Sequence, residues 1–432
     1  MTTLYPFQES GVSYALDHKY IINASTMGTG KTLMALEQID RLGFPALIIC
    51  PAFLKNVWAA EAKKHKPHLK ITICKTKADI PKTLSGIVVV NYEQAEHFGH
   101  LVPAAGTVVI DEAHALKNIK AKRTVLIHKM IKANPPKYLT LLTGTPIKNR
   151  VPELYSLLLL CSYCPTAMAN GYPVTANIRS HWNFCKMFCE ERAKRIPGGA
   201  FVTEFYGLKN PEKLKALIEG KYFRIKTENV LKLPEEIHQN IPVAKITHAQ
   251  DLEDAYARFE KGKVANTETP VKLAVAVEKI KYTAQYIETI LEEDAGPVVV
   301  FSDHVSPCEQ LQEYFTAKSF KSAVITGKVD ANKRQGIVDR FQAGDLDALF
   351  CTIGAASVGI TLTRSNRIVF NDLPWVPGDL DQAKKRIHRI GQNRTVFYSF
   401  ITAPGIDENI VNTLVEKSRV ISNVFDNTEE SK

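Results

Sequence analysis

Features that would direct the protein to a membrane or to secretion are missing from the sequence. The 432-residue chain has no run of about eighteen apolar residues, the length that a membrane-spanning helix requires. Its first residues, Met1–Pro6, lack the basic and apolar regions of a signal peptide. The sequence therefore predicts an intracellular protein that makes no contact with a membrane.

Cysteine is sparse, with eight residues in the chain. Cys161 and Cys164, together with Cys185 and Cys189, have spacings that zinc ligands can adopt. However, apolar residues surround all four, and buried thiols usually behave as small hydrophobic groups. We expect structural thiols at these positions rather than a zinc site.

The overall composition is that of an ordinary globular protein, with 45% hydrophobic and 23% charged residues. The length favours two domains, because a single core rarely grows to this size. The net charge of +10 favours an anionic partner, most simply a nucleic acid. A generally basic cellular background would explain the charge equally well.

A glycine turn between an apolar run, Tyr20–Ala24, and a helical pattern is typical of a phosphate-binding loop. Gly28 and Gly30 allow a tight backbone turn, so that successive N–H groups point at a polyphosphate. The following helix adds the positive end of its dipole. Lys31 can then reach the β- and γ-phosphates, and the Thr32 hydroxyl can bind Mg²⁺. An ordinary strand-to-helix turn with a surface lysine is the alternative interpretation.

Short apolar runs alternate with helical patterns through the first third of the chain. This alternation predicts a doubly wound parallel sheet, in which ligands gather at the carboxyl ends of the strands. The expected strands are Tyr20–Ala24, Ala46–Pro51, Leu69–Cys74, Ile87–Val90, Val108–Ile110 and Tyr138–Leu142.

Two of these strands end in residues suited to nucleotide chemistry. Asp111 can hold Mg²⁺, usually through water, and Glu112 can orient and polarise an attacking water molecule. Thr143 and Thr145 follow the next strand and can sense the γ-phosphate. The alternatives are a strand that ends in surface acids and a simple turn built from Thr, Gly and Pro.

Several segments together resemble the motifs of superfamily 2 helicase-like ATPases of the Swi2/Snf2 type. Residues 27–32, 111–114 and 143–149 are similar to motifs I, II and III. Residues 382–392 resemble motif VI almost residue for residue, and residues 357–362 resemble motif V. The resemblance extends from Leu4 to about Phe425, nearly the whole chain.

This resemblance implies an α/β fold with two RecA-like parallel-sheet lobes in tandem. We expect lobe 1 in residues 1–150, a helical protrusion and linker in 151–290, and lobe 2 with a closing helix in 291–432. Within the middle part, helices are expected at Val151–Cys161 and near Trp182–Arg195. Residues 243–290 are charged and helix-prone.

The resemblance also implies ATP and Mg²⁺ as ligands and assigns roles to individual residues. The implied catalytic residues are Lys31, Asp111, Glu112, Gln382, Arg386 and Arg389. The implied nucleotide-binding residues are Gln8, Met27, Gly28, Thr29, Gly30, Lys31, Thr32 and Gly359. Thr32 and Asp111 are the implied magnesium ligands. Candidates for coupling or DNA contact are His114, Thr143, Thr145, Thr352 and Trp375.

Two of these assignments also have a direct physical basis. Gln8 carries a donor and an acceptor in one amide, which suits the adenine edge. Gln382, Arg386 and Arg389 are spaced i, i+4 and i+7, which predicts that they share one helix face. Two guanidinium groups there can act as arginine fingers on the γ-phosphate. A solvated basic helix is the alternative.

The sequence departs from the family pattern in two places. Ser25 and Thr26 stand where the family usually has acidic residues before Met-Gly, and Ser25 also replaces the first glycine of the strict phosphate-loop pattern. We expect ATP binding to persist, since both lie outside the lysine and hydroxyl contacts. The altered start of motif V, Ile353–Ser357, affects the DNA contacts expected there.

These observations predict an ATP-dependent translocase on double-stranded DNA that acts as a monomer. The minimal size and the segment Val369–Gly378 favour the annealing-helicase branch, which remodels branched DNA. The alternatives are a strand-separating helicase, a remover of proteins from DNA, and a catalytically silent DNA-binding scaffold. Because no reader domain or long basic tail suggests chromatin, we expect a cytoplasmic protein of a prokaryotic or virus-infected cell.

Overall fold

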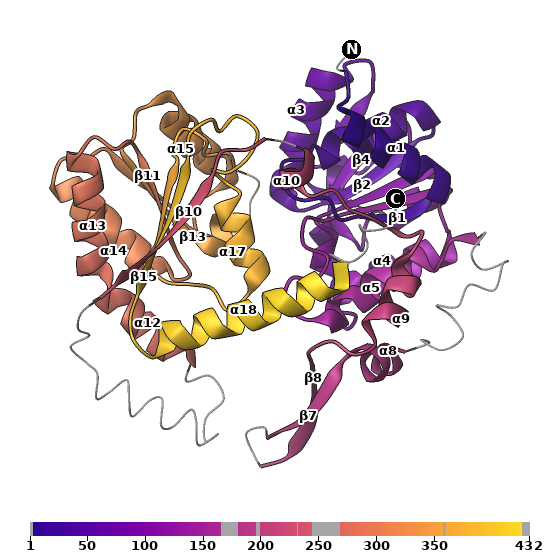
Figure 1. Cartoon of the computed structure of the whole chain (residues 1–432). Helices are drawn as coiled ribbons and strands as arrows, with labels where there is room; N and C mark the ends of the chain where they lie inside the picture. Colours follow the sequence, from indigo (N-terminus) through magenta and orange to yellow (C-terminus); the bar gives the residue numbers. More distant parts are fainter. Residues whose placement is uncertain are drawn as a thin grey trace. The chain divides into compact units, whose positions relative to one another are not determined.

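The computed structural model describes residues 3–165, 180–195, 199–230, 232–243, 268–356 and 360–425. The chain forms two compact units (Figure 1). Unit 1 comprises Met1–Glu191, Phe205–Lys232 and Val420–Lys432, and unit 2 comprises Arg192–Glu204 and Leu233–Arg419. The divisions predicted at residues 150 and 290 stay predictions. No helix of the described segments is long and apolar enough to cross a membrane.

Unit 1 is built on a seven-stranded parallel sheet with the order β3-β4-β2-β5-β6-β1-β9. The strands are β1 (Tyr20–Asn23), β2 (Ala46–Cys50), β3 (Ile71–Ile73), β4 (Ile87–Asn91), β5 (Thr107–Asp111), β6 (Tyr138–Leu142) and β9 (Tyr222–Phe223). The strands predicted from apolar runs are all present. Sequence analysis did not predict β9, because two residues carry no detectable period.

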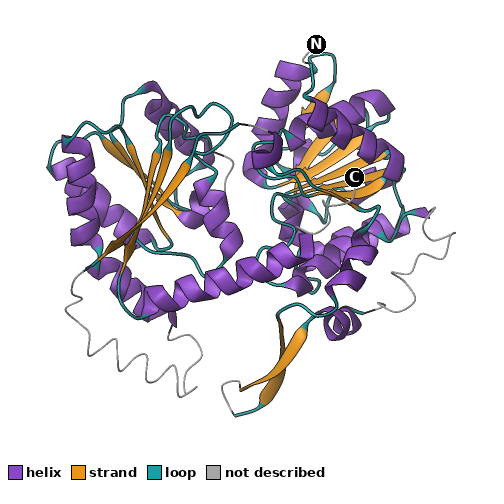
Figure 2. Cartoon of the chain, viewed as in Figure 1, coloured by secondary structure: helices purple, strands orange, loops and turns teal. Residues whose placement is uncertain are grey.

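Helices cover both faces of this sheet (Figure 2), which explains why its strands are almost continuously apolar. Successive residues of β2 belong to different cores, Leu47 to one cluster and Ile48 to the other. The helices are α1 (Pro6–His18), α2 (Lys31–Leu42), α3 (Lys55–His65), α4 (Lys122–Ala133), α5 (Leu154–Cys161), α8 (His181–Phe188), α9 (Pro211–Ile218) and α10 (Thr227–Val230).

The prediction of one helix over Trp182–Arg195 is wrong in its second half. Helix α8 ends at Phe188, and the chain continues as strand β7 (Glu190–Arg195), which pairs with β8 (Phe201–Tyr206) in a separate two-stranded sheet. On this hairpin the nearly buried Glu204 carboxylate accepts hydrogen bonds from Arg192 and Lys194, which fixes the extended backbone.

The four cysteines considered as zinc ligands are part of the core of unit 1. Cys161, Cys164, Cys185 and Cys189 are all buried and belong to its larger hydrophobic cluster. Among the described residues, no group of three or more His, Cys, Asp or Glu side chains is arranged to hold a metal ion. The thiols therefore fill space in the core.

Unit 2 contains a six-stranded parallel sheet with the order β10-β15-β14-β11-β13-β12. Its strands are β10 (Glu236–Pro242), β11 (Val298–Ser302), β12 (Ser322–Ile325), β13 (Ala348–Thr352), β14 (Arg367–Phe370) and β15 (Val396–Thr402). The helices are α12 (Glu268–Glu278), α13 (Ile280–Glu292), α14 (Val305–Ala317), α15 (Ala331–Ala343), α16 (Ile353–Ala356), α17 (Pro377–Lys384) and α18 (Ile406–Phe425). Two parallel α/β sheets confirm the predicted fold class.

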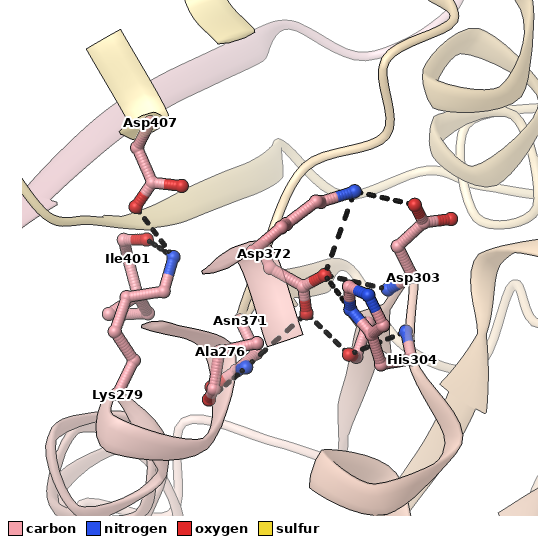
Figure 3. A network of polar contacts seen from close by, with 10 residues as sticks. Ala276, Lys279, Asp303, His304, Asn371, Asp372, Ile401 and Asp407 are labelled. Atoms are coloured by element: carbon pink, nitrogen blue, oxygen red, sulfur yellow. Dashed lines mark hydrogen bonds and ion pairs between the residues drawn. The ribbon is translucent and has the colours of Figure 1, made fainter. Parts of the chain in front are cut away.

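Buried charges tie the elements of unit 2 together (Figure 3). Lys279, at the junction of α12 and α13, is fully buried, and its ammonium donates to the Asp407 carboxylate at 2.7 Å and to the Ile401 carbonyl at 2.8 Å. Asp372, which follows β14, accepts a hydrogen bond from the backbone N–H of Asp303 and contacts the His304 ring at 3.1 Å. Each buried charge thus has a partner of opposite sign or a polar group beside it.

The pKa of Asp372 reflects this network. Burial alone would raise the pKa of its carboxyl. The hydrogen bond with His304 and the charges of Lys279 and Lys272 outweigh burial and hold the pKa below its ordinary value. Asp372 is therefore an ionised group at the carboxyl edge of the sheet, and it fixes the ends of β11 and β14 to each other.

Candidate nucleotide-binding site

The register of three neighbouring strands brings the predicted motifs of unit 1 together. Leu142 of β6 is level with Asn23 of β1 on one side and with Asp111 of β5 on the other. The phosphate loop after β1, the acidic pair at the end of β5 and the threonine turn after β6 therefore leave the sheet at one edge. This is the edge at which parallel α/β sheets bind ligands.

The phosphate loop requires glycine at two positions. Gly28 and Gly30 have φ values of 84° and 82°, which side chains rarely adopt. A Cβ atom on Gly30 would also lie 2.4 Å from Nε2 of Gln8. The buried Gln8 amide donates to the Thr29 carbonyl at 3.0 Å, so in this structure Gln8 supports the loop. Its contact with adenine stays a prediction.

The side chain of Lys31 is folded onto the loop that it follows. Lys31 is the first residue of α2, and its ammonium donates to the carbonyls of Ser25 at 2.7 Å and Thr26 at 3.1 Å. Thr29 donates from its hydroxyl to the same Thr26 carbonyl at 2.8 Å. An incoming phosphate would have to draw Lys31 away from these two carbonyls.

Two further predicted residues complete the loop. Met27 lies beside Gly144, where a Cβ atom would come within 3.1 Å of its Cγ atom. Thr32 lies in the first turn of α2 and is partly exposed. The loop residues assigned from the sequence are therefore neighbours in space, and the N-terminus of α2 points its dipole at them.

Asp111 is held rigidly at the end of β5. Its Oδ2 accepts a hydrogen bond from the Trp58 indole at 2.9 Å, and its Oδ1 accepts from the Glu112 backbone N–H at 2.8 Å. The Tyr92 hydroxyl donates to the Asp111 carbonyl at 2.6 Å. The sequence places Trp58 in an amphipathic helix and gives no sign that its indole reaches Asp111.

The acidic pair has the donor chemistry that Mg²⁺ favours. Burial raises the pKa of Asp111 above its ordinary value, and the neighbouring Glu112 charge raises it further. A divalent cation relieves both effects, and hard oxygen ligands are what Mg²⁺ prefers. The Asp111 carboxylate therefore suits the magnesium role that the sequence predicts, and the role of the Thr32 hydroxyl stays a prediction.

A polar relay connects the acidic pair to the threonine turn. Glu112 adopts a left-handed backbone conformation with φ 49°, and its Oε2 lies 3.2 Å from Nδ1 of His114. The same nitrogen lies 3.3 Å from the Thr143 hydroxyl, which in turn accepts from the Thr145 backbone N–H at 3.2 Å. His114 thus contacts both Glu112 and Thr143, and Thr143 contacts Thr145, so a chain of polar contacts joins the acidic pair to the threonine turn.

The predicted motif VI residues belong to unit 2. The prediction that they share one helix face is wrong. Helix α17 ends at Lys384, so only Gln382 is helical, whereas Arg386 and Arg389 lie in the turns that follow. The Arg386 carbonyl accepts from the Leu362 backbone N–H at 2.9 Å, which removes it from any continuing helix. Tertiary hydrogen bonding thus overrides the sequence spacing.

The remaining predicted residues have varied surroundings. Thr352 is buried at the end of β13, and Trp375 packs against the core of unit 2 while its carbonyl accepts from Lys417 at 2.8 Å. Arg386 is buried with Nη1 3.5 Å from the Ile360 carbonyl. Gly359 and the rest of residues 357–359 lie outside the described residues.

An ion pair that sequence analysis did not predict fixes the motif VI turns. Nδ1 of His388 lies 2.6 Å from Glu236 of β10, and its Nε2 lies 2.9 Å from the Pro234 carbonyl. Burial alone would lower the pKa of His388, but these two partners raise it above 6.5. Burial alone would raise the pKa of Glu236, yet His388 and Lys384 bring it to about 2.

This pair gives unit 2 a defined pH dependence. The stabilisation from His388 is present below pH 6.5 and is lost as the pH rises through its raised pKa, while that from Glu236 is present above pH 4.5 and is lost towards pH 2. We therefore expect Glu236→Gln to lower the melting temperature most between pH 4.5 and 6.5. Melting curves at several pH values would measure this, with exposed Glu313→Gln as the control. An equal loss at pH 6 and pH 9 would contradict the pairing.

Comparison with known proteins gives independent information. Residues 8–172 match the SNF2-related domain and residues 278–391 match the helicase conserved C-terminal domain. The chain is 28% identical over 96% of its length to a SWI/SNF-related regulator of chromatin subfamily A-like protein 1 homolog of Caenorhabditis elegans, of which it covers 60%. It is 26% identical over 99% of its length to the human DNA annealing helicase and endonuclease ZRANB3, of which it covers 41%.

A solved structure is also similar. The SWI2/SNF2 ATPase core of Sulfolobus solfataricus in complex with double-stranded DNA aligns with 99% of this chain and 93% of its own, at 24% identity and a TM-score of 0.45. The chain spans about half the length of the curated relatives named above.

These relatives correct the predicted localisation. The expectation of a cytoplasmic protein from a prokaryotic or virus-infected cell is wrong, because the matching curated proteins are those of animals and include regulators of chromatin. The prediction rested on the absence of a reader domain. That absence carried no information, since the chain corresponds to only part of each relative.

Proposed function

Because this chain belongs to the SNF2 family of helicase-like proteins, we propose that it is an ATP-dependent translocase on double-stranded DNA that remodels branched DNA. One observation carries the proposal: Lys31, the Asp111–Glu112 pair and Thr143 all lie at the same edge of the sheet of unit 1. The names of the relatives, among them a DNA annealing helicase, support the choice of DNA.

In this proposal each residue of unit 1 has a defined task. The backbone N–H groups around Gly28 and Gly30 and the Lys31 ammonium bind the phosphates of ATP. Glu112 orients the attacking water and accepts its proton, while His114 holds the carboxylate in place. Bound Mg²⁺, held by Thr32 and Asp111, would neutralise charge that develops on the phosphates.

Unit 2 supplies the cations of the proposed mechanism. In the proposal, Arg386 and Arg389 stabilise the negative charge of the γ-phosphate, and Gln382 helps to position it. The net charge of +10 suits a partner whose phosphates supply most of the binding energy. Binding to DNA is therefore expected to tolerate any sequence and to weaken with salt.

Measurement of ATP hydrolysis with different nucleic acids tests this function. We expect stimulation by linear duplex, and stronger stimulation by forked or four-way DNA. Lys31→Ala is expected to lower the rate about a hundredfold or more, since a group that stabilises phosphate charge is lost. Its melting temperature should stay close to that of the wild type, which excludes misfolding as the cause.

Other outcomes point to the alternative functions. Stimulation by single strands alone would favour a strand-separating helicase, and ATP-dependent release of a DNA-bound protein without preference for branches would favour protein removal. The absence of hydrolysis under every condition would reject the motor and leave a DNA-binding scaffold.

A further inference from the structure

The phosphate loop is hydrogen-bonded along one side to a segment about two hundred residues later in the sequence. Strand β9 pairs with β1, and the ladder does not stop where the strands end. The backbone N–H groups of residues 22, 24 and 26 donate in turn to the carbonyls of residues 221, 223 and 225, at 2.7, 2.7 and 2.9 Å. The pairing thus continues from the strand into the first half of the loop.

Side chains add to this pairing at the two positions where the sequence departs from its family. The Ile225 backbone N–H donates to the Ser25 hydroxyl at 3.2 Å, and the Thr227 backbone N–H donates to the Thr26 hydroxyl at 2.8 Å. The Thr227 hydroxyl donates to the Met27 carbonyl at 3.3 Å and also contacts the Thr26 hydroxyl. The acidic residues that the family usually has at positions 25 and 26 would replace these neutral hydroxyl groups with carboxylates.

The same stretch of the loop is held from its other side by Lys31. The Lys31 ammonium donates to the carbonyls of Ser25 and Thr26. These are the bonds that an ATP phosphate would draw Lys31 away from. The contacts with residues 225–227 involve other atoms of the loop, so they persist when Lys31 turns to the nucleotide.

We propose that Thr227 is a positioning residue for ATP binding, which fixes the phosphate loop through Thr26 and Met27. The inference rests on the proposed function and assigns a further residue to its ATP site. The chain passes into unit 2 at Leu233, shortly after Thr227. The segment that leads out of unit 1 is therefore the one that holds the loop in its binding conformation.

The start of this segment is itself anchored in unit 1. The Tyr222 ring stacks on Phe425 with centroids 4.8 Å apart, and the Arg224 guanidinium lies over the same Phe425 ring at 5.4 Å. Thr26 and Thr227 are both buried. A loop ordered in advance by such contacts loses less conformational freedom when the nucleotide binds.

Direct titration with a fluorescent ATP analogue tests the proposal. Thr227→Val keeps the shape of the side chain and removes the hydroxyl that reaches Met27 and Thr26. We expect about fivefold to tenfold weaker binding, the effect of losing one to two hydrogen bonds. The KM for ATP should rise by a similar factor, whereas kcat at saturating ATP should stay within about twofold, because no group at the reacting phosphate is changed.

Two further variants separate positioning from general stability. Thr227→Ser restores the hydroxyl and should bind the analogue nearly as the wild type does. Thr124→Val removes a buried hydroxyl of the same unit that has no hydrogen-bond partner within the described segments, and should leave binding unchanged. Binding by Thr227→Val within about twofold of the wild type, or an equal loss in Thr227→Ser, would overturn the proposal.

The titration also distinguishes this inference from the proposed function. If the wild-type protein binds the analogue but never hydrolyses ATP, the translocase is rejected, and the binding comparison still decides the role of Thr227. If hydrolysis occurs and Thr227→Val behaves as the wild type, only the positioning role is rejected.

Discussion

Replacement of Glu112 by glutamine is expected to lower ATP hydrolysis about a hundredfold or more while ATP still binds. Glutamine keeps the size of the side chain but cannot accept a proton, and a positioned general base contributes about 10²- to 10⁴-fold to a rate. Glu112 has the geometry for this role, with its Oε2 3.2 Å from His114 and its backbone next to the Asp111 carboxylate.

The variant separates chemistry from binding. Rates of ATP hydrolysis should be measured at saturating ATP and duplex DNA, together with the affinity for a fluorescent ATP analogue. Glu96→Gln is a matched control, since that carboxylate is half exposed and pairs with Lys122 at the surface. A Glu112→Gln protein that hydrolyses ATP within tenfold of the wild type would show that another group activates the water.

Replacement of Lys279 by methionine is expected to destabilise unit 2 by about 3–5 kcal/mol. The change leaves the Asp407 carboxylate buried without the cation that it contacts at 2.7 Å, and an uncompensated buried charge has this cost. The Ile401 carbonyl loses a donor as well. Among the described residues, Asp407 would keep its bond from the Ala403 backbone N–H at 2.7 Å.

Denaturant unfolding of the full chain would measure this effect. The Lys281→Met variant, at an exposed position in the first turn of α13, should change the free energy of unfolding by about 0.5 kcal/mol or less. The double variant Lys279→Met with Asp407→Leu should recover much of the loss, because both charges are then removed. A single Lys279→Met variant as stable as the wild type would show that Asp407 finds another partner.

Much of the fold was predictable because its strands are buried on both faces. Runs such as Val298–Ser302 and Arg367–Phe370 are short, apolar and bounded by polar residues, and both are strands in the structure. The terminal helix Ile406–Phe425 agrees with the closing helix predicted within residues 291–432. Strand β9 and the β7–β8 hairpin were missed, since two residues or a mixed charged strand carry no clear period.

The residues proposed for nucleotide chemistry were predictable from the sequence alone. Two motifs can be recognised from residues that are adjacent in the sequence. One is a glycine turn that ends in Lys31 and Thr32, and the other is an apolar strand that ends in Asp111 and Glu112. The same is true of the resemblance to the Swi2/Snf2 family, which the SNF2-related and helicase C-terminal domains confirm.

The contacts that hold those residues in place became visible in the folded structure alone. Three contacts join residues that are far apart in the sequence. They are the hydrogen bond from Trp58 to Asp111, the hydrogen bond from Thr227 to the phosphate loop and the ion pair of Glu236 with His388. A hydroxyl, an indole or a carboxylate has the same local signature wherever its partner lies. Which of these groups meet depends on the strand order and register of the folded chain. The end of α17 before Arg386 likewise depends on contacts made in the folded chain.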